Sequence, residues 1–427
     1  MNHTDQVFKA VDQLWEEQIG FLQQLGRYKS TLHNEGPIQR FLADTFRDMQ
    51  LETDCFIPDL KMMASHKEFS PVEWTYDNRP VVVAKWVSNG PKRGKSLIVQ
   101  GHVDVVSPEP VRLWNYDPWG ATIEGDRMYG RGIMDMKAGV SAMIYAVKAI
   151  QASGIELSAD LLIETVLEEE CTGNGALATL VKGYVADGAL IPEPSGHGVS
   201  LSQVGVIWFR VRITGAGAHV SGKAKSINAI EKAYVLIQAL GRYSDKINNA
   251  PKHPEFGHVN HPLNVNIGVI KGGDWPSTVP ADCYFEVRAG LYPGQDPQDV
   301  KDDVLAWLLE AASQDEWLRE VPPEITFFGF HANGVVIDPK EELFSVLESA
   351  HGKVLDEPMQ YRSGLTALTD IRHYNLYYNI PATCYGPRGG NIHSADEWVD
   401  LPSLKACTKV YAAFILEWCG VRDVSVE

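Results

Sequence analysis

A short apolar run that breaks into polar residues constrains the fold of this chain more than any other feature. Residues 97–99, Leu-Ile-Val, are continuously apolar rather than alternating, which is typical of a strand covered on both faces. The chain then reaches His102 and Asp104. Side chains two residues apart on an extended chain point the same way, so both polar groups emerge where the strand ends. The pattern predicts either local polar contacts or a bound group at that point.

The first half of the chain alternates strand-like and helix-like segments. Apolar strands are predicted at 79–87, 96–106, 158–167 and 188–194. A helix is predicted at 136–154, with Gly154 close to its end. This alternation favours an α/β fold, and we expect a mixed, mostly parallel sheet covered by helices.

The pattern changes after residue 204. Residues 205–215 alternate apolar and polar side chains, as a half-exposed antiparallel strand does. A following helix is predicted to end at Gly241 and to carry one apolar stripe, formed by Ile227, Ile230, Tyr234 and Ile237. Two more strands and a second helix complete what we expect to be an inserted α+β domain at 205–337. The main domain is then 1–204 together with 338–427, since 427 residues exceed one ordinary core.

Composition and terminal sequence indicate which partners to expect. The formal net charge of −17, with no long basic run, argues against nucleic acid and anionic membranes as main partners. The first residues lack the apolar core of a signal peptide, and no apolar stretch is long enough for a membrane span. The six cysteines include no CxxC pair, which fits reduced thiols. We therefore expect a cytoplasmic protein.

Acidic or imidazole side chains follow several predicted strands. They are His102, Asp135, the three glutamates 168–170, Glu193 and His393. In open α/β sheets the ligand crevice lies outside the carboxyl ends of the strands, so these groups can converge. Each alone has an ordinary explanation: a polar strand end, a solvated acidic face, or a helix cap for Asp135. Together, histidines and carboxylates without cysteine favour a divalent metal site, with zinc expected first and cobalt or manganese as alternatives.

Six motifs in fixed order resemble a known family. They are "GHVDVV", "YGRGIMDMKAG", "EEECTGNG", "PEPSG", "GAGAHVSG" and "GGNIHSADEWV". From about residue 80 onward the chain resembles the dinuclear metallohydrolases that include acetylornithine deacetylase, succinyl-diaminopimelate desuccinylase, aminoacylase and glutamate carboxypeptidase. The resemblance implies two divalent metal ions. It implies these ligands: His102 and Glu193 for the first metal, Glu170 and His393 for the second, and Asp135 as the bridge.

The resemblance also implies catalytic roles. Glu169 is expected to act as the general base on a metal-activated water. Asp104 is expected to fix the tautomer of His102 through its carboxylate. His219 is expected to stabilise the oxyanion from the partner subunit of a homodimer formed by the inserted domain, the alternative being a polar residue at a strand end. A cis peptide bond is expected between Asp135 and Met136.

The substrate is expected to be a small N-acylated molecule, but the anchoring residues are less specific. The candidates are Asn228, Arg288, Arg372 and the backbone of Gly389 and Gly390. Arg288 could equally be a solvated sheet position, and Arg372 could instead pair with Asp370. Removal of an acyl group from an N-acyl amino acid or similar amine is the first expectation. A metallo-dipeptidase, carboxypeptidase or other C–N hydrolase is the alternative, and an inactive binding relative would lack a ligand or the base.

Overall fold

The computed structural model describes residues 2–90 and 93–422 and confirms the α/β fold class. Its main sheet has the strand order β1-β2-β6-β3-β7-β18. The strands are β1 (Glu52–Phe56), β2 (Val81–Trp86), β6 (Leu161–Val166), β3 (Leu97–His102), β7 (Ala189–Ile191) and β18 (Ala382–Cys384). β6, β3, β7 and β18 are mutually parallel, whereas β2 runs antiparallel to both of its neighbours. The carboxyl ends of the four parallel strands therefore share one edge.

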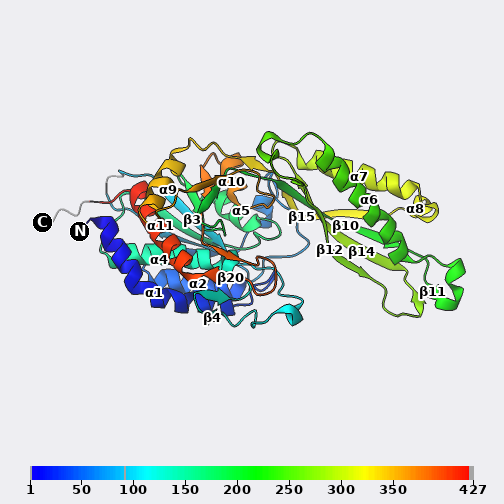
Figure 1. Cartoon of the computed structure of the whole chain (residues 1–427), viewed down its shortest axis with the longest axis horizontal. Coiled ribbons are helices and arrows are strands. Elements are labelled where there is room, and N and C mark those ends of the chain that lie inside the picture. Colours follow the sequence, from blue (N-terminus) through cyan, green and yellow to red (C-terminus); the bar gives the residue numbers. More distant parts are fainter. Residues whose placement is uncertain (1, 91–92, 423–427) are drawn as a thin grey trace.

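Helices cover both faces of this sheet, which explains why its strands are continuously apolar (Figure 1). The helices outside the inserted segment are α1 (His3–Arg27), α2 (Gly36–Asp48), α3 (Leu60–Met63), α4 (Ala138–Ala152), α5 (Asn174–Val181), α9 (Glu342–Gly352), α10 (Ile371–Tyr377) and α11 (Leu401–Cys419). α1, α4 and α11 pack against one another, while α5 and α10 lie on the opposite face. α4 ends as predicted, with Gly154 in the left-handed region at φ +66°.

A second, antiparallel sheet is built from the predicted inserted segment. Its order is β12 (Val265–Gly272), β14 (Asp282–Leu291), β10 (Gly205–Thr214) and β15 (Glu324–Ala332). The helices α6 (Ala229–Asn249) and α7 (Pro297–Ser313) pack on it, and the short α8 (Glu316–Glu320) follows α7. Figure 1 shows this unit extending away from the main sheet. The boundaries at 205 and 337 stay a prediction.

The predicted apolar stripe of α6 is wrong. Ile230 and Tyr234 are exposed, and the helix continues through Gly241 to Asn249. The buried face consists of smaller or differently spaced residues: Ala229, Ala233, Leu236, Leu240 and Tyr243. Sequence periodicity found an amphipathic helix but selected the wrong face, because the face that meets the sheet is formed partly by small alanines rather than by large apolar side chains.

Several small pairings position the loops. They are β19 (Gly389–Gly390), β20 (Trp398–Asp400), β5 (Arg127–Tyr129) and β4 (Thr122–Glu124) in one sheet, and the pairs β8 (Gly198–Ser200) with β17 (Gln360–Arg362), β9 (Ser202–Gln203) with β16 (Val335–Val336), and β11 (Ala218–His219) with β13 (Thr278–Val279). In the described part of the chain, no helix combines the length and apolarity that crossing a bilayer requires.

Candidate functional site

The predicted metal-binding side chains converge at the carboxyl ends of the parallel strands. His102 is the last residue of β3, and Glu193 lies two residues beyond β7. Glu169 and Glu170 lie in the turn after β6, and Asp135 lies in the helical turn Ile133–Lys137 before α4. His393 comes from the loop between β19 and β20. Parallel strands align their carboxyl ends, so residues almost 300 positions apart meet at one edge.

Asp135 lies between two imidazoles. Its Oδ1 is 3.2 Å from His102 Nε2, and its Oδ2 is 3.6 Å from His393 Nε2. Each carboxylate oxygen therefore faces a different histidine, which is the geometry of a carboxylate that bridges two ions.

Each histidine has a second carboxylate beside it. His102 Nε2 lies 3.8 Å from Glu193 Oε1, and His393 Nε2 lies 2.9 Å from Glu170 Oε1. The ligand atoms of His102, Asp135 and Glu170 lie within 4.8 Å of one another, as do those of His102, Glu169 and Glu193. Glu193 Oε1 is buried and has no hydrogen-bond partner among the described residues. A buried, unpaired carboxylate oxygen among nitrogen and oxygen donors fits divalent cations.

Burial and crowding shift the pKa values of this cluster. Burial, reinforced by the charge of Glu193, raises the pKa of Glu169 well above its usual range. Burial alone would lower the pKa of His393, but the adjacent Glu170 and Asp135 carboxylates raise it to about 9. These carboxylates repel one another, so bound cations would relieve a repulsion that the protein fold imposes.

Asp104 supports the site differently from the prediction. Its backbone carbonyl oxygen lies 2.9 Å from His102 Nδ1, whereas its carboxylate Oδ1 is 3.6 Å from the same nitrogen. The carboxylate instead accepts the backbone N–H groups of Glu169 and Glu170, at 3.2 and 3.1 Å. The tautomer of His102 is therefore set by the main chain of residue 104, and the side chain shapes the turn that carries Glu169.

Glu168, which the sequence left without a role, holds the same turn from its other side. It is fully buried, and its φ of +65° places it in the left-handed region. Its Oε1 accepts from Trp74 Nε1 at 2.7 Å and Arg79 Nη2 at 2.5 Å. Its Oε2 accepts from the hydroxyls of Tyr76 at 2.7 Å and Thr172 at 2.9 Å. Three of these partners, Trp74, Tyr76 and Arg79, lie about 90 positions before the motif, so no local signal identifies them.

Glu397 plays a similar part for the turn that carries Asp135. It is fully buried and pairs with Arg131. Its carboxylate accepts the backbone N–H groups of Gly132, Met134 and Asp135 at 2.9 to 3.0 Å. The peptide bond between Asp135 and Met136 is cis, as predicted. The only sequence signal for Glu397 is its place in the motif that contains His393.

His219 and Asn228 lie in the second unit, away from the predicted metal-binding side chains. His219 is exposed in β11, and Figure 1 shows β11 at the far end of that unit. Its Nδ1 lies 2.9 Å from the Ser221 hydroxyl. The Asn228 side chain caps α6 by accepting from the N–H groups of Ile230 and Glu231. Within one chain, neither residue is brought to the site.

The predicted substrate role of Arg372 is wrong. Its side chain is fully buried, with Nε 3.1 Å from Glu68 Oε2 and Nη1 3.5 Å from Asp370 Oδ1. Its Nη2 also donates to the carbonyl oxygen of Thr172, at 3.1 Å. Because its N–H donors are bonded inside the protein, Arg372 stabilises the loop after β6 and has no free guanidinium edge for a ligand.

The other predicted anchors have structural partners as well. Arg288 on β14 donates from Nη2 to the carbonyl oxygen of Thr366, at 3.0 Å, and so connects the second sheet to a loop beside the site. A Cβ at Gly389 would lie 2.2 Å from Trp398 O, and one at Gly390 would lie 2.8 Å from Trp398 Nε1. Both glycines are required by the close approach of β20. A substrate role for these residues stays a prediction.

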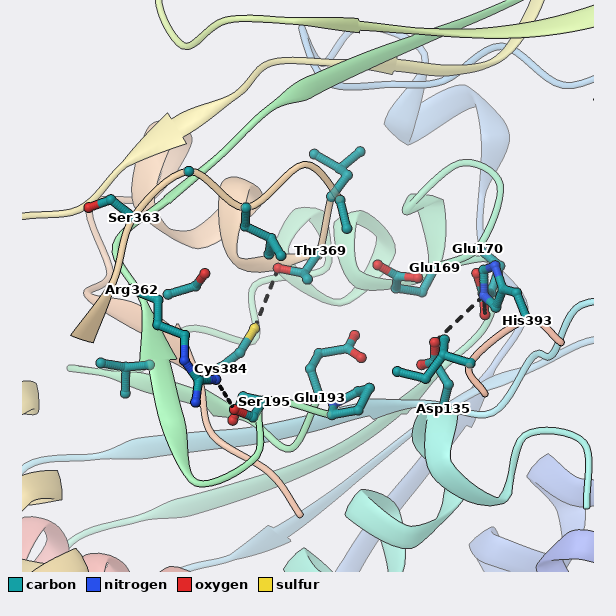
Figure 2. A pocket seen from close by; sticks show the side chains of 18 residues that line it. Asp135, Glu169, Glu170, Glu193, Ser195, Arg362, Ser363, Thr369, Cys384 and His393 are labelled. Atoms are coloured by element: carbon teal, nitrogen blue, oxygen red, sulfur yellow. Dashed lines mark hydrogen bonds and ion pairs between the residues drawn. The ribbon is translucent and has the colours of Figure 1, made fainter. Parts of the chain in front are cut away.

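A cavity of about 550 Å³ opens beside the predicted metal-binding side chains. Asp135, Glu169, Glu170, Glu193 and His393 line one part of it, as Figure 2 shows. The remaining wall is largely apolar and comes from two strands, β8 and β18, and two loops, with these residues: Val199, Leu365, Ala367, Leu368, Cys384 and Ile392. A few convergent polar groups in an apolar cavity are typical of a small-molecule site.

Comparisons with known proteins show which enzymes this chain is similar to. The chain is 29% identical over 369 residues to N-formyl-4-amino-5-aminomethyl-2-methylpyrimidine deformylase of Halalkalibacterium halodurans, which covers 81% of this chain and 84% of that protein. It is 27% identical over 329 residues to acetylornithine deacetylase of Proteus mirabilis, covering 76% and 79%. The fold matches human carnosine dipeptidase 1 with a TM-score of 0.76 at 18% identity, covering 97% and 99%. It matches a dipeptidase from Saccharomyces cerevisiae with a TM-score of 0.78 at 19% identity, covering 98% and 99%.

The family comparison covers most of the molecule. Residues 98–417 match the description "Peptidase family M20/M25/M40". That range includes all of the predicted metal-binding side chains, the cavity and the second unit. The chain therefore belongs to peptidase family M20/M25/M40.

Proposed function

We propose that this hydrolase removes the acyl group from a small N-acylated amine, with N-acyl amino acids as the first substrates to test. The observation that carries the proposal is the placement of Asp135 between His102 and His393, with Glu169 at the same edge. The relatives named as a deformylase and a deacetylase support acyl removal. The same predicted metal ligands would also serve a metallo-dipeptidase. The test must therefore distinguish dipeptide hydrolysis from acyl removal.

Two divalent ions in this site would polarise the scissile carbonyl and lower the pKa of a water molecule toward about 7. Glu169 would take the proton of that water and pass it to the departing amine. Its Oε2 lies 4.0 Å from His102 Nε2, and its side chain lines the cavity. Asp104 accepts the backbone N–H of Glu169 and so fixes the main chain that carries the proposed base. Zinc is the proposed metal, and cobalt or manganese would suit the same oxygen and nitrogen donors.

We further propose a homodimer formed through the second unit. β12 is an edge strand of the antiparallel sheet, and Ile270 on it is 53% exposed. Tyr234 on α6 and Trp275 after β12 are 60% and 68% exposed, and large apolar side chains exposed on one unit favour its burial against a second copy. His219 belongs to the same unit, and the dimer would carry it to the partner's site. A reducing cytoplasm suits the six cysteines, none of which forms a disulfide.

The function is tested with purified protein whose metal content is measured. A panel should contain N-formyl and N-acetyl amino acids, an N-formyl aminomethylpyrimidine and dipeptides. We expect the N-acyl compounds to be hydrolysed, chelation to abolish turnover, and Glu169→Gln to lower kcat by about 10²–10⁴-fold while metal stays bound. Hydrolysis confined to dipeptides would favour the peptidase, and turnover that survives chelation would contradict the proposed mechanism.

A further inference from the structure

The cavity beside the metal-binding side chains has two chemically different ends. Figure 2 shows Asp135, Glu170 and His393 at one end, Arg362, Ser195 and Ser363 at the other, and Glu193 between them. Among the described residues that line the cavity, Arg362 is the one arginine or lysine. A ligand whose reacting amide lies near Asp135 can therefore reach a single cationic side chain at the far end.

Arg362 is held in position by its surroundings. It ends β17, where it lies opposite Ser200 of β8, and its carbonyl oxygen accepts the Leu201 N–H at 2.7 Å. Its Nη1 donates to the carbonyl oxygen of Ser195 at 2.6 Å. A Cβ at Gly198 would lie 3.1 Å from Arg362 Cζ, so glycine leaves room for the guanidinium against the turn after β7. The head group is thereby oriented while it stays accessible.

No carboxylate of the described residues forms an ion pair with Arg362, and the bond to Ser195 O is its one side-chain hydrogen bond there. Its neighbour Arg388 provides the contrast. Both guanidinium-bearing side chains lie close to Gly196, but Arg388 is paired with Glu357. Arg388 is therefore neutralised within the protein, while most donors of Arg362 remain available to a ligand.

Hydroxyl groups surround the same end of the cavity. Ser200 and Ser363 line it, and within the described chain neither hydroxyl makes a hydrogen bond. The Ser195 Oγ accepts the Gly386 N–H at 2.8 Å, which leaves its own proton free to donate. Arg362 and these serines together offer donors to an acceptor-rich, negatively charged group, and Arg is the side chain best suited to a carboxylate.

We propose that Arg362, supported by Ser200 and Ser363, binds a carboxylate of the substrate at the end of the cavity away from the metal-binding side chains. The inference rests on the proposed function and adds a substrate class to it: a small N-acylated amine that carries a carboxylate. The carboxylate can belong to the amine half, as in an N-acyl amino acid, or to the acyl half, as in an N-succinyl amine. In either case Arg362 determines specificity, and neither Arg288 nor Arg372 is needed as the anchor.

Two matched substrate pairs test the proposal with the metal-loaded protein. N-acetylalanine against N-acetylalaninamide places the carboxylate on the amine half. N-succinylbenzylamine against its terminal carboxamide places it on the acyl half. For at least one pair, the wild type should favour the carboxylate in kcat/KM, and Arg362→Ala should lower that preference about tenfold, the contribution of one charge-assisted hydrogen bond near solvent. Arg362→Lys should retain part of the preference, and the matched control Arg388→Ala should retain all of it.

A preference that Arg362→Ala leaves unchanged in both pairs would overturn the inference, as would a wild type with no preference. Binding supplies a measurement that does not depend on turnover. Calorimetric titration with 4-phenylbutanoate and 4-phenylbutanol should show a carboxylate preference that weakens in Arg362→Ala. A carboxylate bound only by metal would bind both proteins equally, which contradicts the proposal. If no amide is hydrolysed, the proposed function fails, while the titration still decides whether Arg362 binds the anion.

Discussion

His102 and Asp104 are joined through the main chain: the Nδ1 of His102 lies 2.9 Å from the carbonyl oxygen of Asp104 and 3.6 Å from its carboxylate. The carboxylate is consequently free to accept the N–H groups of Glu169 and Glu170. One residue thus orients the predicted metal ligand His102 with its backbone and holds the turn that carries Glu169 with its side chain. The two functions can be separated by mutation because every residue type supplies a carbonyl oxygen.

Asp104→Asn should therefore leave metal content largely intact while it impairs the turn. The amide has one oxygen to accept two N–H groups, so one buried hydrogen bond is lost, at a cost of about 1–3 kcal/mol. We expect a lower free energy of unfolding in urea and a lower kcat at unchanged metal content. Loss of metal without loss of stability would instead show that the carboxylate orients His102.

The geometry around Asp135 predicts how metal content responds to each ligand. Glu193→Ala and Glu170→Ala should each remove about one ion of a pair per chain, whereas Asp135→Ala should weaken both sites because its two oxygens face different histidines. Elemental analysis after dialysis measures the content. Glu164→Gln, a change at a buried acid outside the cluster, is the control. An Asp135→Ala protein that keeps both ions would contradict the bridging role.

Removal of the Glu168 carboxylate should destabilise the fold. Arg79 is 3% exposed, and Glu168→Ala leaves it with Glu35 as its remaining carboxylate partner while Trp74 and Tyr76 lose their acceptor. Breaking a buried ion pair costs about 3–5 kcal/mol when one charge is left behind, and Glu35 should reduce that figure. Urea unfolding measures it. Arg47→Ala, which breaks the exposed pair with Asp44, should change stability little. Equal effects of the two variants on the free energy of unfolding would show that the buried contacts of Glu168 do not stabilise the fold.

Glu164 predicts a pH-dependent stability. Burial raises its pKa to about 8 from an ordinary value of 4.5, although the hydroxyls of Thr179 and Tyr374 partly offset the shift. Between these values the folded protein holds a proton that the unfolded chain has released, so stability falls as pH rises, by up to about 1.4 kcal/mol per unit. Glu164→Gln removes this dependence. Its stability relative to wild type should increase from pH 5 to pH 8, and a constant difference would contradict the raised pKa.

Mixing two inactive variants tests the proposed homodimer. His219→Ala and Glu169→Gln should each be nearly inactive alone. In a random mixed dimer, the site that retains Glu169 receives His219 from the other chain, so exchange should restore about one quarter of wild-type activity. Sedimentation confirms that dimers are present. No recovery after verified exchange would place the action of His219 within its own chain or outside catalysis.

The sequence alone singled out the polar side chains that converge at the cavity, because most of them follow a short apolar strand and parallel strands bring their carboxyl ends to a common edge. Local patterns and the resemblance in ordered motifs were enough to predict these side chains, which are His102, Asp135, Glu170, Glu193 and His393. The α/β class followed from the same patterns. These features depend on the periodicity of apolar residues and on the position of polar residues after them, and both can be read from a single sequence.

Only the tertiary structure decided which polar side chains are free to meet a ligand. Arg372 was expected to bind substrate, but Glu68, 304 positions earlier in the chain, occupies it. Arg362 carries no motif, yet it faces the cavity without a carboxylate partner among the described residues. Tertiary packing likewise determined which face of α6 is exposed and which side chains contact the buried Glu168. The availability of a charged group depends on contacts between distant segments, and these form only when the whole chain has packed.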